Sequence, residues 1–142
     1  MQLNLSHLPR ILFVDDDALF GALMSRLAEK GKIPLCHVTS PREINLVRLK
    51  ETYDIMILDY ELQNVSGIQL VRSFEVLSLN IPTLLISSYS KLPNHQLPSS
   101  VISFMHKSNG PQAILWSAIK NFRGSEILHC DLQTRIKFSS QT

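Results

Sequence analysis

Residues 54–67 read DIMILDYELQNVSG, and this stretch decides the fold. Four apolar residues, Ile55 to Leu58, run without interruption into Asp59, and a polar loop then leads to Gly67. A short apolar run bounded by turn-forming residues is typical of a buried strand. The stretch therefore predicts a buried strand that ends in a carboxylate.

Four other apolar runs alternate with helical patterns along the chain. The predicted strands span residues 11–14, 35–38, 55–58, 83–86 and 101–105. The first helical pattern has apolar residues on one face, at Phe20, Leu23, Met24 and Leu27. Asp17 is suited to cap the start of this helix, and Gly31 is suited to end it.

Three more helices are expected. The second begins at Pro41 with Ile44, Val47 and Leu49, the third has Leu70, Phe74 and Leu77, and the last begins at Pro111 with Leu115, Ala118, Ile119 and Phe122. Residues 89–98 contain two prolines, so any helix there is expected to be short or broken. Alternation of strands and helices over five repeats predicts a parallel sheet with helices on both faces.

The composition fits one globular domain and does not indicate a membrane or nucleic-acid partner. The chain has 142 residues, of which 44% are hydrophobic, and a formal net charge of +2. No apolar run has the length of a membrane span, and residues 1–10 lack the features of a signal peptide. Cys36 and Cys130 have neither disulfide-scaffold nor zinc spacing. We therefore expect reduced cysteines and a cytoplasmic location.

Polar groups follow four of the predicted strands. They are Asp15-Asp16-Asp17 after the first strand, Asp59 after the third, Ser87-Ser88 after the fourth and His106-Lys107 after the fifth. These groups should converge, because the carboxyl ends of parallel strands meet at one edge of the sheet. Clustered carboxylates repel one another unless a cation such as Mg²⁺ lies among them, whereas a lysine and a hydroxyl favour an anion. The set predicts a site for a phosphoryl group and Mg²⁺, in which a carboxylate can form an aspartyl phosphate.

Each residue of this set also has an ordinary structural interpretation. Negative charge is favoured at a helix N-terminus, which explains Asp17 better than Asp15 or Asp16. The remaining residues could lie in loops, in turns or on the solvated surface. Their shared position at strand ends favours the functional interpretation.

Four segments match one family in order: ILFVDDD, DIMILDYELQNVSG, IPTLLISS and ISFMHKS. Over residues 9–123 the chain resembles response-regulator receiver domains, a family that includes the chemotaxis regulator. The resemblance implies an α/β fold of the flavodoxin-like (βα)5 type, a doubly wound parallel sheet with strand order 2-1-3-4-5. Residues 124–142 would then be a C-terminal tail, either an extension or a truncated linker.

The resemblance assigns roles at the site. Asp59 would be the phosphoacceptor. Asp16 and Asp59 would bind Mg²⁺ directly, together with the backbone carbonyl of Glu61, and Asp15 would act largely through water. Lys107 would pair with the phosphoryl oxygens.

The same resemblance implies a switch around the acceptor. The Ser87 hydroxyl would turn toward the phosphoryl group, and Phe104 would change rotamer with it. Tyr89 and Glu61 lie where the family varies and would tune the rate of phosphate loss. Ser88 stands where a small apolar residue is usual and would narrow access to the acceptor.

The implied function is a bacterial, cytoplasmic receiver domain of a two-component system. It would take its phosphoryl group from a histidine kinase or phosphotransfer protein, and it would not be an enzyme beyond Mg²⁺-dependent self-phosphorylation and autodephosphorylation. The partner surface, and a possible homodimer contact, would be the face of the fourth and fifth helices and the fifth strand. Nucleic acid would be bound only through an output domain that is not in this chain.

The sequence departs from the family pattern in the loops. Gln63 stands where proline is usual after the acceptor, and Ser108 stands where proline often follows the lysine with a cis bond. A cis bond before a residue other than proline costs about 3 kcal/mol, so we predict a trans bond between Lys107 and Ser108.

Two other functions compete with the phosphoacceptor. One is a receiver-like interaction module that works without phosphorylation, although such modules usually lack an acid or the lysine that this chain keeps. The other is a phosphatase of the haloacid-dehalogenase type, indicated by the DxD formed by Asp15 and Asp17. That family needs a further acidic pair after the lysine, where this chain has only Glu126 and Asp131.

Overall fold

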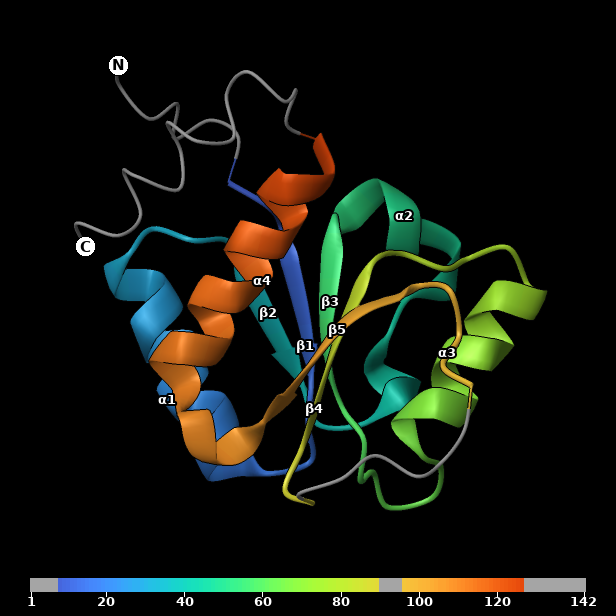
Figure 1. Cartoon of the computed structure of the whole chain (residues 1–142), viewed down its shortest axis with the longest axis horizontal. Coiled ribbons are helices and arrows are strands. Elements are labelled where there is room, and N and C mark those ends of the chain that lie inside the picture. The colour runs from blue at the N-terminus through green and yellow to red at the C-terminus, as the bar shows by residue number, and fades with distance from the viewer. Residues whose placement is uncertain (1–7, 90–95, 127–142) are drawn as a thin grey trace.

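The strands form one parallel sheet in the order β2-β1-β3-β4-β5 (Figure 1). The computed structural model describes residues 8–89 and 96–126. The strands are β1 (Ile11–Val14), β2 (Leu35–Val38), β3 (Ile55–Asp59), β4 (Thr83–Ser87) and β5 (Val101–His106). Their order confirms the doubly wound, flavodoxin-like sheet expected from the sequence, and three of them extend one residue into the polar groups.

Helices cover both faces of the sheet (Figure 1). The α-helices are α1 (Ala18–Lys30), α2 (Leu49–Thr52), α3 (Gly67–Val76) and α4 (Pro111–Glu126), and the 3₁₀ turns are η2 (Pro41–Glu43), η3 (Leu46–Arg48) and η4 (Lys107–Asn109). Helices α1 and α4 lie side by side on one face, whereas α2 and α3 lie on the other. Helix α4 begins at Pro111, where the sequence predicted the last helix to begin.

Two apolar cores lie on either side of the sheet, and β1 contributes to both. Ile11 and Phe13 pack against α1 and α4, whereas Leu12 and Val14 pack in the core that includes α3. All four side chains are buried. A central parallel strand is covered on both faces, which is why it reads as a continuous apolar run rather than an alternating one.

Helix ends follow the chemistry of their capping residues. The Asp17 side chain accepts a hydrogen bond from the Phe20 amide, and Gly31 follows the last residue of α1, as predicted. Ser66 and Gln69 form a reciprocal capping box at the start of α3. This box fixes where α3 begins after the loop that follows Asp59.

The second predicted helix is wrong as a continuous element. Pro41 begins only the 3₁₀ turn η2, Ile44 is extended, and α2 has four residues. Val47 is 88% exposed, although we expected it on the apolar face. The spacing explains the error, because Ile44, Val47 and Leu49 do not keep the steps of three and four residues that one helix face requires.

The described part of the connection between β4 and β5 differs from the other connections between strands. Its described residues, 88–89 and 96–100, contain no helix. Most of the proline-containing stretch lies outside the described residues, as do Cys130 and the tail from residue 127 onward. β5 is an edge strand and is less buried than the inner strands β1, β3 and β4, and its Ile102 is 40% exposed.

Side chains of α3 hold the end of this connection. The Arg72 guanidinium donates to the Gln96 carbonyl at 3.0 Å. The Glu75 carboxylate accepts from the Ser99 hydroxyl at 3.1 Å, and from the Ser100 amide and hydroxyl at 3.0 and 2.5 Å. These bonds tie the residues that precede β5 to α3.

Replacing Glu75 with alanine is expected to destabilise the fold by about 1–3 kcal/mol, because the buried Ser100 loses its acceptor. Urea unfolding followed by circular dichroism measures this change. Glu29→Ala is the matched control, since Glu29 is exposed on α1. Equal stability of the two variants would show that the Glu75 contacts contribute nothing.

Candidate functional site

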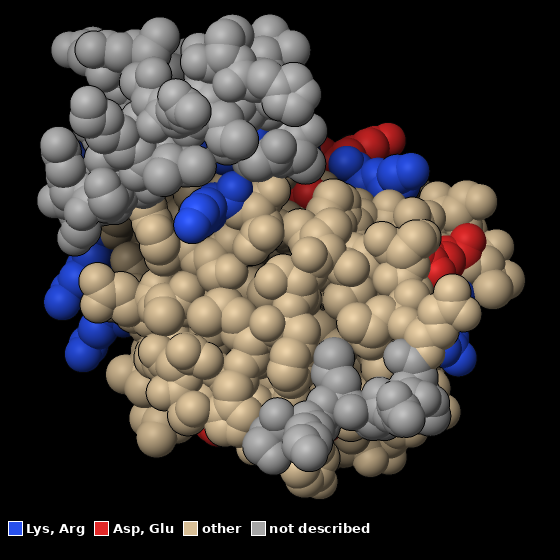
Figure 2. Space-filling view, in the orientation of Figure 1, with Lys and Arg blue, Asp and Glu red and all other residues tan. Residues whose placement is uncertain are grey.

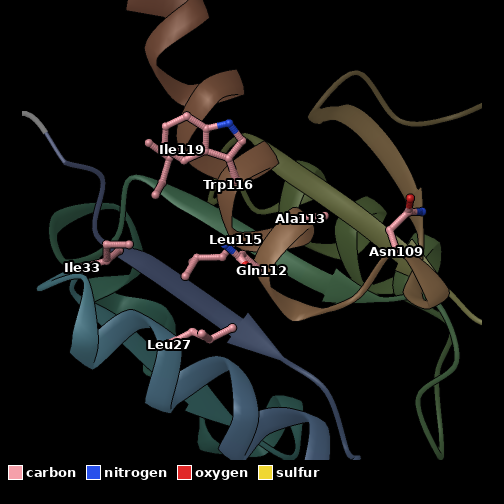
Figure 3. Close-up of a pocket in the computed structure, with 8 residues that line it drawn as sticks. All are labelled: Leu27, Ile33, Asn109, Gln112, Ala113, Leu115, Trp116 and Ile119. Atoms are coloured by element: carbon pink, nitrogen blue, oxygen red, sulfur yellow. The ribbon is translucent and has the colours of Figure 1, made fainter. Parts of the chain in front are cut away.

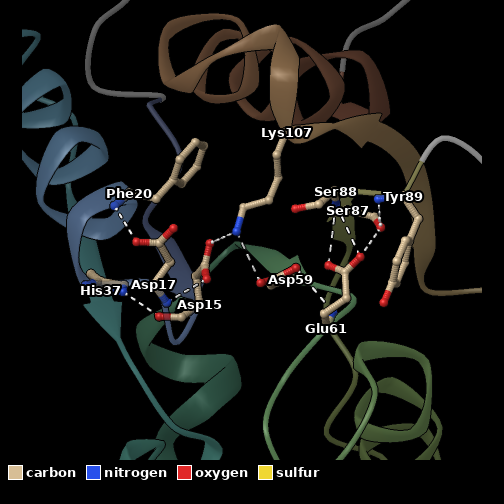
Figure 4. A network of polar contacts seen from close by, with 10 residues as sticks. All are labelled: Asp15, Asp17, Phe20, His37, Asp59, Glu61, Ser87, Ser88, Tyr89 and Lys107. Carbon is tan, nitrogen blue, oxygen red and sulfur yellow. Dashed lines mark hydrogen bonds and ion pairs between the residues drawn. The ribbon is translucent and has the colours of Figure 1, made fainter.

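The polar strand ends converge at one edge of the sheet (Figure 4). Asp15 follows β1, Asp59 ends β3, Ser87 ends β4 and Lys107 follows β5. Strands of one parallel sheet bring these residues together, although they are as far apart as 92 positions in the chain. The predicted convergence is confirmed.

Lys107 joins two buried carboxylates. Its Nζ lies 2.8 Å from Asp15 Oδ2 and 3.3 Å from Asp59 Oδ2. Both aspartates are almost completely buried, and the ammonium lies 4.9 Å from the centre of the Phe20 ring. The ring covers the ammonium and adds a cation–π contact, so the ion pairs are shielded from water.

A third carboxylate completes an acidic cluster. Asp15, Asp16 and Asp59 can each offer one oxygen so that these oxygens lie within 4.8 Å of one another. Asp17 is outside this cluster, because its side chain is exposed and caps α1. Asp17 therefore caps a helix, as its ordinary structural interpretation predicted. The phosphatase hypothesis needs Asp15 and Asp17 together at the site, and Asp17 lies outside the cluster.

The surroundings of Asp59 shift its pKa. Burial, the nearby Glu61 carboxylate and the negative charge of Asp15 together raise the pKa of Asp59 to about 8, while Lys107 opposes the rise. Burial lowers the pKa of Lys107, but its contacts with Asp15 and Asp59 outweigh burial and raise it overall. The single ammonium thus does not offset burial and the neighbouring negative charge at Asp59.

The donor set fits a hard divalent cation. Carboxylate oxygens are the ligands that Mg²⁺ prefers, and the cluster has an excess of negative charge over Lys107. The cluster is also partly open, because Asp16 is only half-buried and lines a cavity of about 340 Å³ with the loop after β3. A cation could therefore reach the carboxylates from this side.

Glu61 reaches from the loop after β3 to the end of β4 (Figure 4). Its Oε1 accepts from the Ser87 hydroxyl at 2.5 Å and from the Ser88 amide at 3.2 Å. Burial would raise the pKa of Glu61, but hydrogen bonding with Asp59 and Ser87 lowers it overall. The sequence placed Glu61 near the site, through its backbone carbonyl and as a residue that tunes phosphate loss, but it did not predict the contact of its carboxylate with Ser87 and Ser88.

A sequence model of the response regulator receiver domain matches residues 11–117. The chain belongs to this family. The matched residues include all the polar groups at the strand ends, from Asp15 to Lys107. It is therefore a regulatory domain rather than a member of a catalytic enzyme family.

A curated relative and two solved structures are similar to this chain. The putative two-component response regulator ARR21 of Arabidopsis thaliana is 26% identical over 103 residues, which are 71% of this chain and 17% of that protein. The receiver domain of Francisella response regulator 1452 has a TM-score of 0.69 at 18% identity, over 82% of this chain and 98% of that one. Thermotoga maritima TrrA, solved in complex with Mg²⁺ and BeF, has a TM-score of 0.65 at 20% identity, over 79% and 97%. The receiver thus spans about a sixth of its curated relative, and the solved structures share its fold.

The remaining predicted residues surround the receiver's acidic edge. Phe104 is partly buried against the core that includes α3. The Tyr89 ring is exposed, and its amide donates to the Ser87 hydroxyl oxygen at 3.0 Å. The bond between Lys107 and Ser108 is trans, as predicted. Tyr89 thus lies beside the Ser87 hydroxyl, whereas Phe104 lies opposite Leu85 of β4.

Gly67 lets α3 approach the acceptor strand. A Cβ atom at this position would lie 2.7 Å from the Asp59 carbonyl oxygen and 3.1 Å from the Tyr60 Cα. Both are backbone atoms that cannot move aside like a flexible side chain. The glycine in the acceptor loop is therefore required by close packing behind Asp59.

A separate groove lies between α1 and α4 (Figure 3). It has a volume of about 550 Å³ and is lined mainly by apolar side chains, including Leu27, Ile33 and Trp116. Trp116 is 39% exposed. None of the lining residues belongs to the acidic cluster.

Replacing Asp59 with asparagine is expected to stabilise the metal-free receiver increasingly as pH rises. Protonated Asp59 contributes stability that is complete below its ordinary pKa of 3.8 and is lost as pH rises through about 8. Asparagine cannot ionise, so the melting temperature of the variant should exceed that of the wild type by about 5 °C at alkaline pH. Thermal unfolding in EDTA across this pH range measures the difference.

Asp54→Asn provides a control of opposite sign. Hydrogen bonds and charge from Arg10 hold the pKa of Asp54 below its usual value, despite some burial. That carboxylate contributes stability above its ordinary pKa, so Asp54→Asn should lower the melting temperature at neutral pH. Parallel pH profiles for Asp59→Asn and the wild type would contradict the raised pKa of Asp59.

Proposed function

We propose that Asp59 accepts a phosphoryl group from the phosphohistidine of a histidine kinase or phosphotransfer protein. The observation that carries the proposal is the contact of the Lys107 ammonium with Asp59, at the edge of the sheet where the Ser87 hydroxyl and the Ser88 amide also donate to a carboxylate. An anion formed on Asp59 would have cationic and neutral hydrogen-bond donors around it. These are the groups that a phosphoryl group needs.

In the proposed reaction an Asp59 carboxylate oxygen attacks phosphorus, and the bond from phosphorus to the histidine nitrogen breaks. Lys107 balances charge on the transferred oxygens, and Ser87 donates to one of them. Bound Mg²⁺ would neutralise negative charge on the carboxylates and the phosphoryl oxygens. Water that attacks the acylphosphate would return Asp59 to its starting state, and we propose that Tyr89 and Ser88 tune access for this autodephosphorylation.

Mg²⁺ would be held by the acidic cluster. We propose Asp16 and Asp59 as direct ligands with the backbone carbonyl of Glu61, and Asp15 as a ligand acting largely through water. The compact oxygen cluster supports this assignment. The complex of the related TrrA with Mg²⁺ and BeF also supports it.

The signal would leave the site through β4 and β5. We propose that Ser87 turns toward the phosphoryl group and that Phe104 on β5 changes rotamer, which alters the surface beside β5. Around β5 and α4 this surface shows few charged side chains (Figure 2). It would contact a protein partner or a second copy through β5 and α4; the described part of the β4–β5 connection, residues 88–89 and 96–100, contains no helix.

Other aspects of the protein are proposed on the sequence alone. We retain residues 9–123 as the receiver and 124–142 as an extension or linker, with a cytoplasmic location and a bacterial source. No helix in the described ranges is long and apolar enough to cross a membrane. Nucleic acid would be reached only through an output domain beyond this chain, and a phosphorylation-independent interaction module remains the alternative.

Incubation with acetyl phosphate and Mg²⁺ is expected to add one phosphoryl group to the wild type, which intact-protein mass spectrometry measures. Asp59→Asn should gain none, because the amide is not a nucleophile for this transfer. Asp54→Asn, at a surface ion pair with Arg10, is the matched control and should be labelled like the wild type. An unlabelled wild type would favour the phosphorylation-independent alternative.

Asp16→Asn is expected to weaken Mg²⁺ binding by about tenfold or more, since it removes a charged ligand. Titration calorimetry measures the affinity. Asp17→Asn is the control, because asparagine also caps a helix and Asp17 lies outside the cluster. Similar affinities for both variants would remove Asp16 from the ligand set.

A further inference from the structure

We propose that the Glu61 carboxylate is an internal substitute for the phosphoryl group, because it occupies the donors of β4 until phosphorylation displaces it. The inference rests on the proposed phosphoacceptor function and adds a regulatory role for one side chain. It concerns the Glu61 carboxylate and not the backbone carbonyl proposed as a metal ligand.

Three contacts carry the inference. The Ser87 hydroxyl donates to Glu61 Oε1 at 2.5 Å, and the Ser88 amide lies 3.2 Å from Oε1 and 3.5 Å from Oε2. The Glu61 amide also donates to Asp59 Oδ1 at 3.2 Å, which holds the start of the loop against the acceptor. The carboxylate therefore lies between the acceptor and the two donors at the end of β4.

A phosphoryl group on Asp59 would compete for these donors. Its oxygens are strong acceptors, and it adds negative charge beside Glu61. Two anions cannot share one hydroxyl and one amide favourably, and the Glu61 side chain is only half-buried, so it can turn into solvent. Phosphorylation of Asp59 would therefore have to break the hydrogen bonds of Glu61 with Ser87 and Ser88, and the free energy of these bonds opposes it.

The same contacts prepare the unphosphorylated chain. Glu61 gives the Ser87 hydroxyl an anionic acceptor, and the Ser87 oxygen in turn accepts from the Tyr89 amide at 3.0 Å. The end of β4 is therefore ordered around an anion before any phosphoryl group arrives. Loss of the carboxylate should loosen this segment and at the same time strengthen binding of the phosphoryl group.

Beryllofluoride is a suitable probe, because it forms a phosphoryl-like adduct without transfer chemistry. We expect Glu61→Ala to bind beryllofluoride about tenfold more tightly than the wild type at saturating Mg²⁺, with Glu61→Gln between them. Titrations are followed by amide resonances of the isotopically labelled 142-residue chain, after the Mg²⁺ affinity of each variant has been measured. Glu43→Gln is the charge-matched control, since its carboxylate bonds to Thr39 and not to β4.

A second readout separates displacement from a general charge effect. In Glu61→Ala without beryllofluoride, the Ser88 amide should exchange with solvent faster than in the wild type, and the adduct should restore its protection. Glu43→Gln should leave this exchange unchanged.

The outcomes distinguish the two proposals. Beryllofluoride affinity that is equal in wild type and Glu61→Ala, or an unchanged Ser88 amide, would overturn the role of Glu61 while leaving the phosphoacceptor intact. Failure of every form to bind beryllofluoride with Mg²⁺ bound would instead overturn the phosphoacceptor function on which the inference rests.

Discussion

The ion pairs of Lys107 with Asp15 and Asp59 are the interaction on which the acidic edge depends. Two carboxylates lie buried at the ends of neighbouring strands, and desolvation alone would make their charges unfavourable. The ammonium from the far side of β4 compensates part of this cost. Because compensation is incomplete, the pKa of Asp59 is raised, and the edge retains the capacity to take up a cation. This excess of negative charge supports the proposed Mg²⁺ site.

The sheet could be predicted because central parallel strands are buried on both faces and leave uninterrupted apolar runs in the sequence. Convergence of Asp15, Asp59, Ser87 and Lys107 followed from parallel order alone. The Glu61 contact could not be predicted in this way, because it depends on how a loop folds toward a strand 26 residues away. A glutamate two positions after the acceptor gives no signal of where its side chain points.

Helix ends could be predicted from single capping residues. A helix that was predicted from the spacing of several apolar residues was less reliable. Asp17 and Gly31 mark the ends of α1 as their chemistry requires. The second helix was predicted from three apolar residues whose spacing no single face can satisfy, and tertiary packing resolves it into turns that bury Ile44 and Leu49. The β4–β5 connection likewise depends on contacts from α3, which are distant in sequence and invisible to periodicity.

The position of Trp116 determines which spectroscopic signals this receiver can give. It is the only tryptophan in the sequence, and it borders the groove between α1 and α4 rather than the acidic cluster. Its emission will therefore respond to separation of these two helices and to quenchers in solvent. Intrinsic fluorescence is thus a natural monitor of helix packing in this chain, whereas events at the carboxylates need a reporter placed elsewhere.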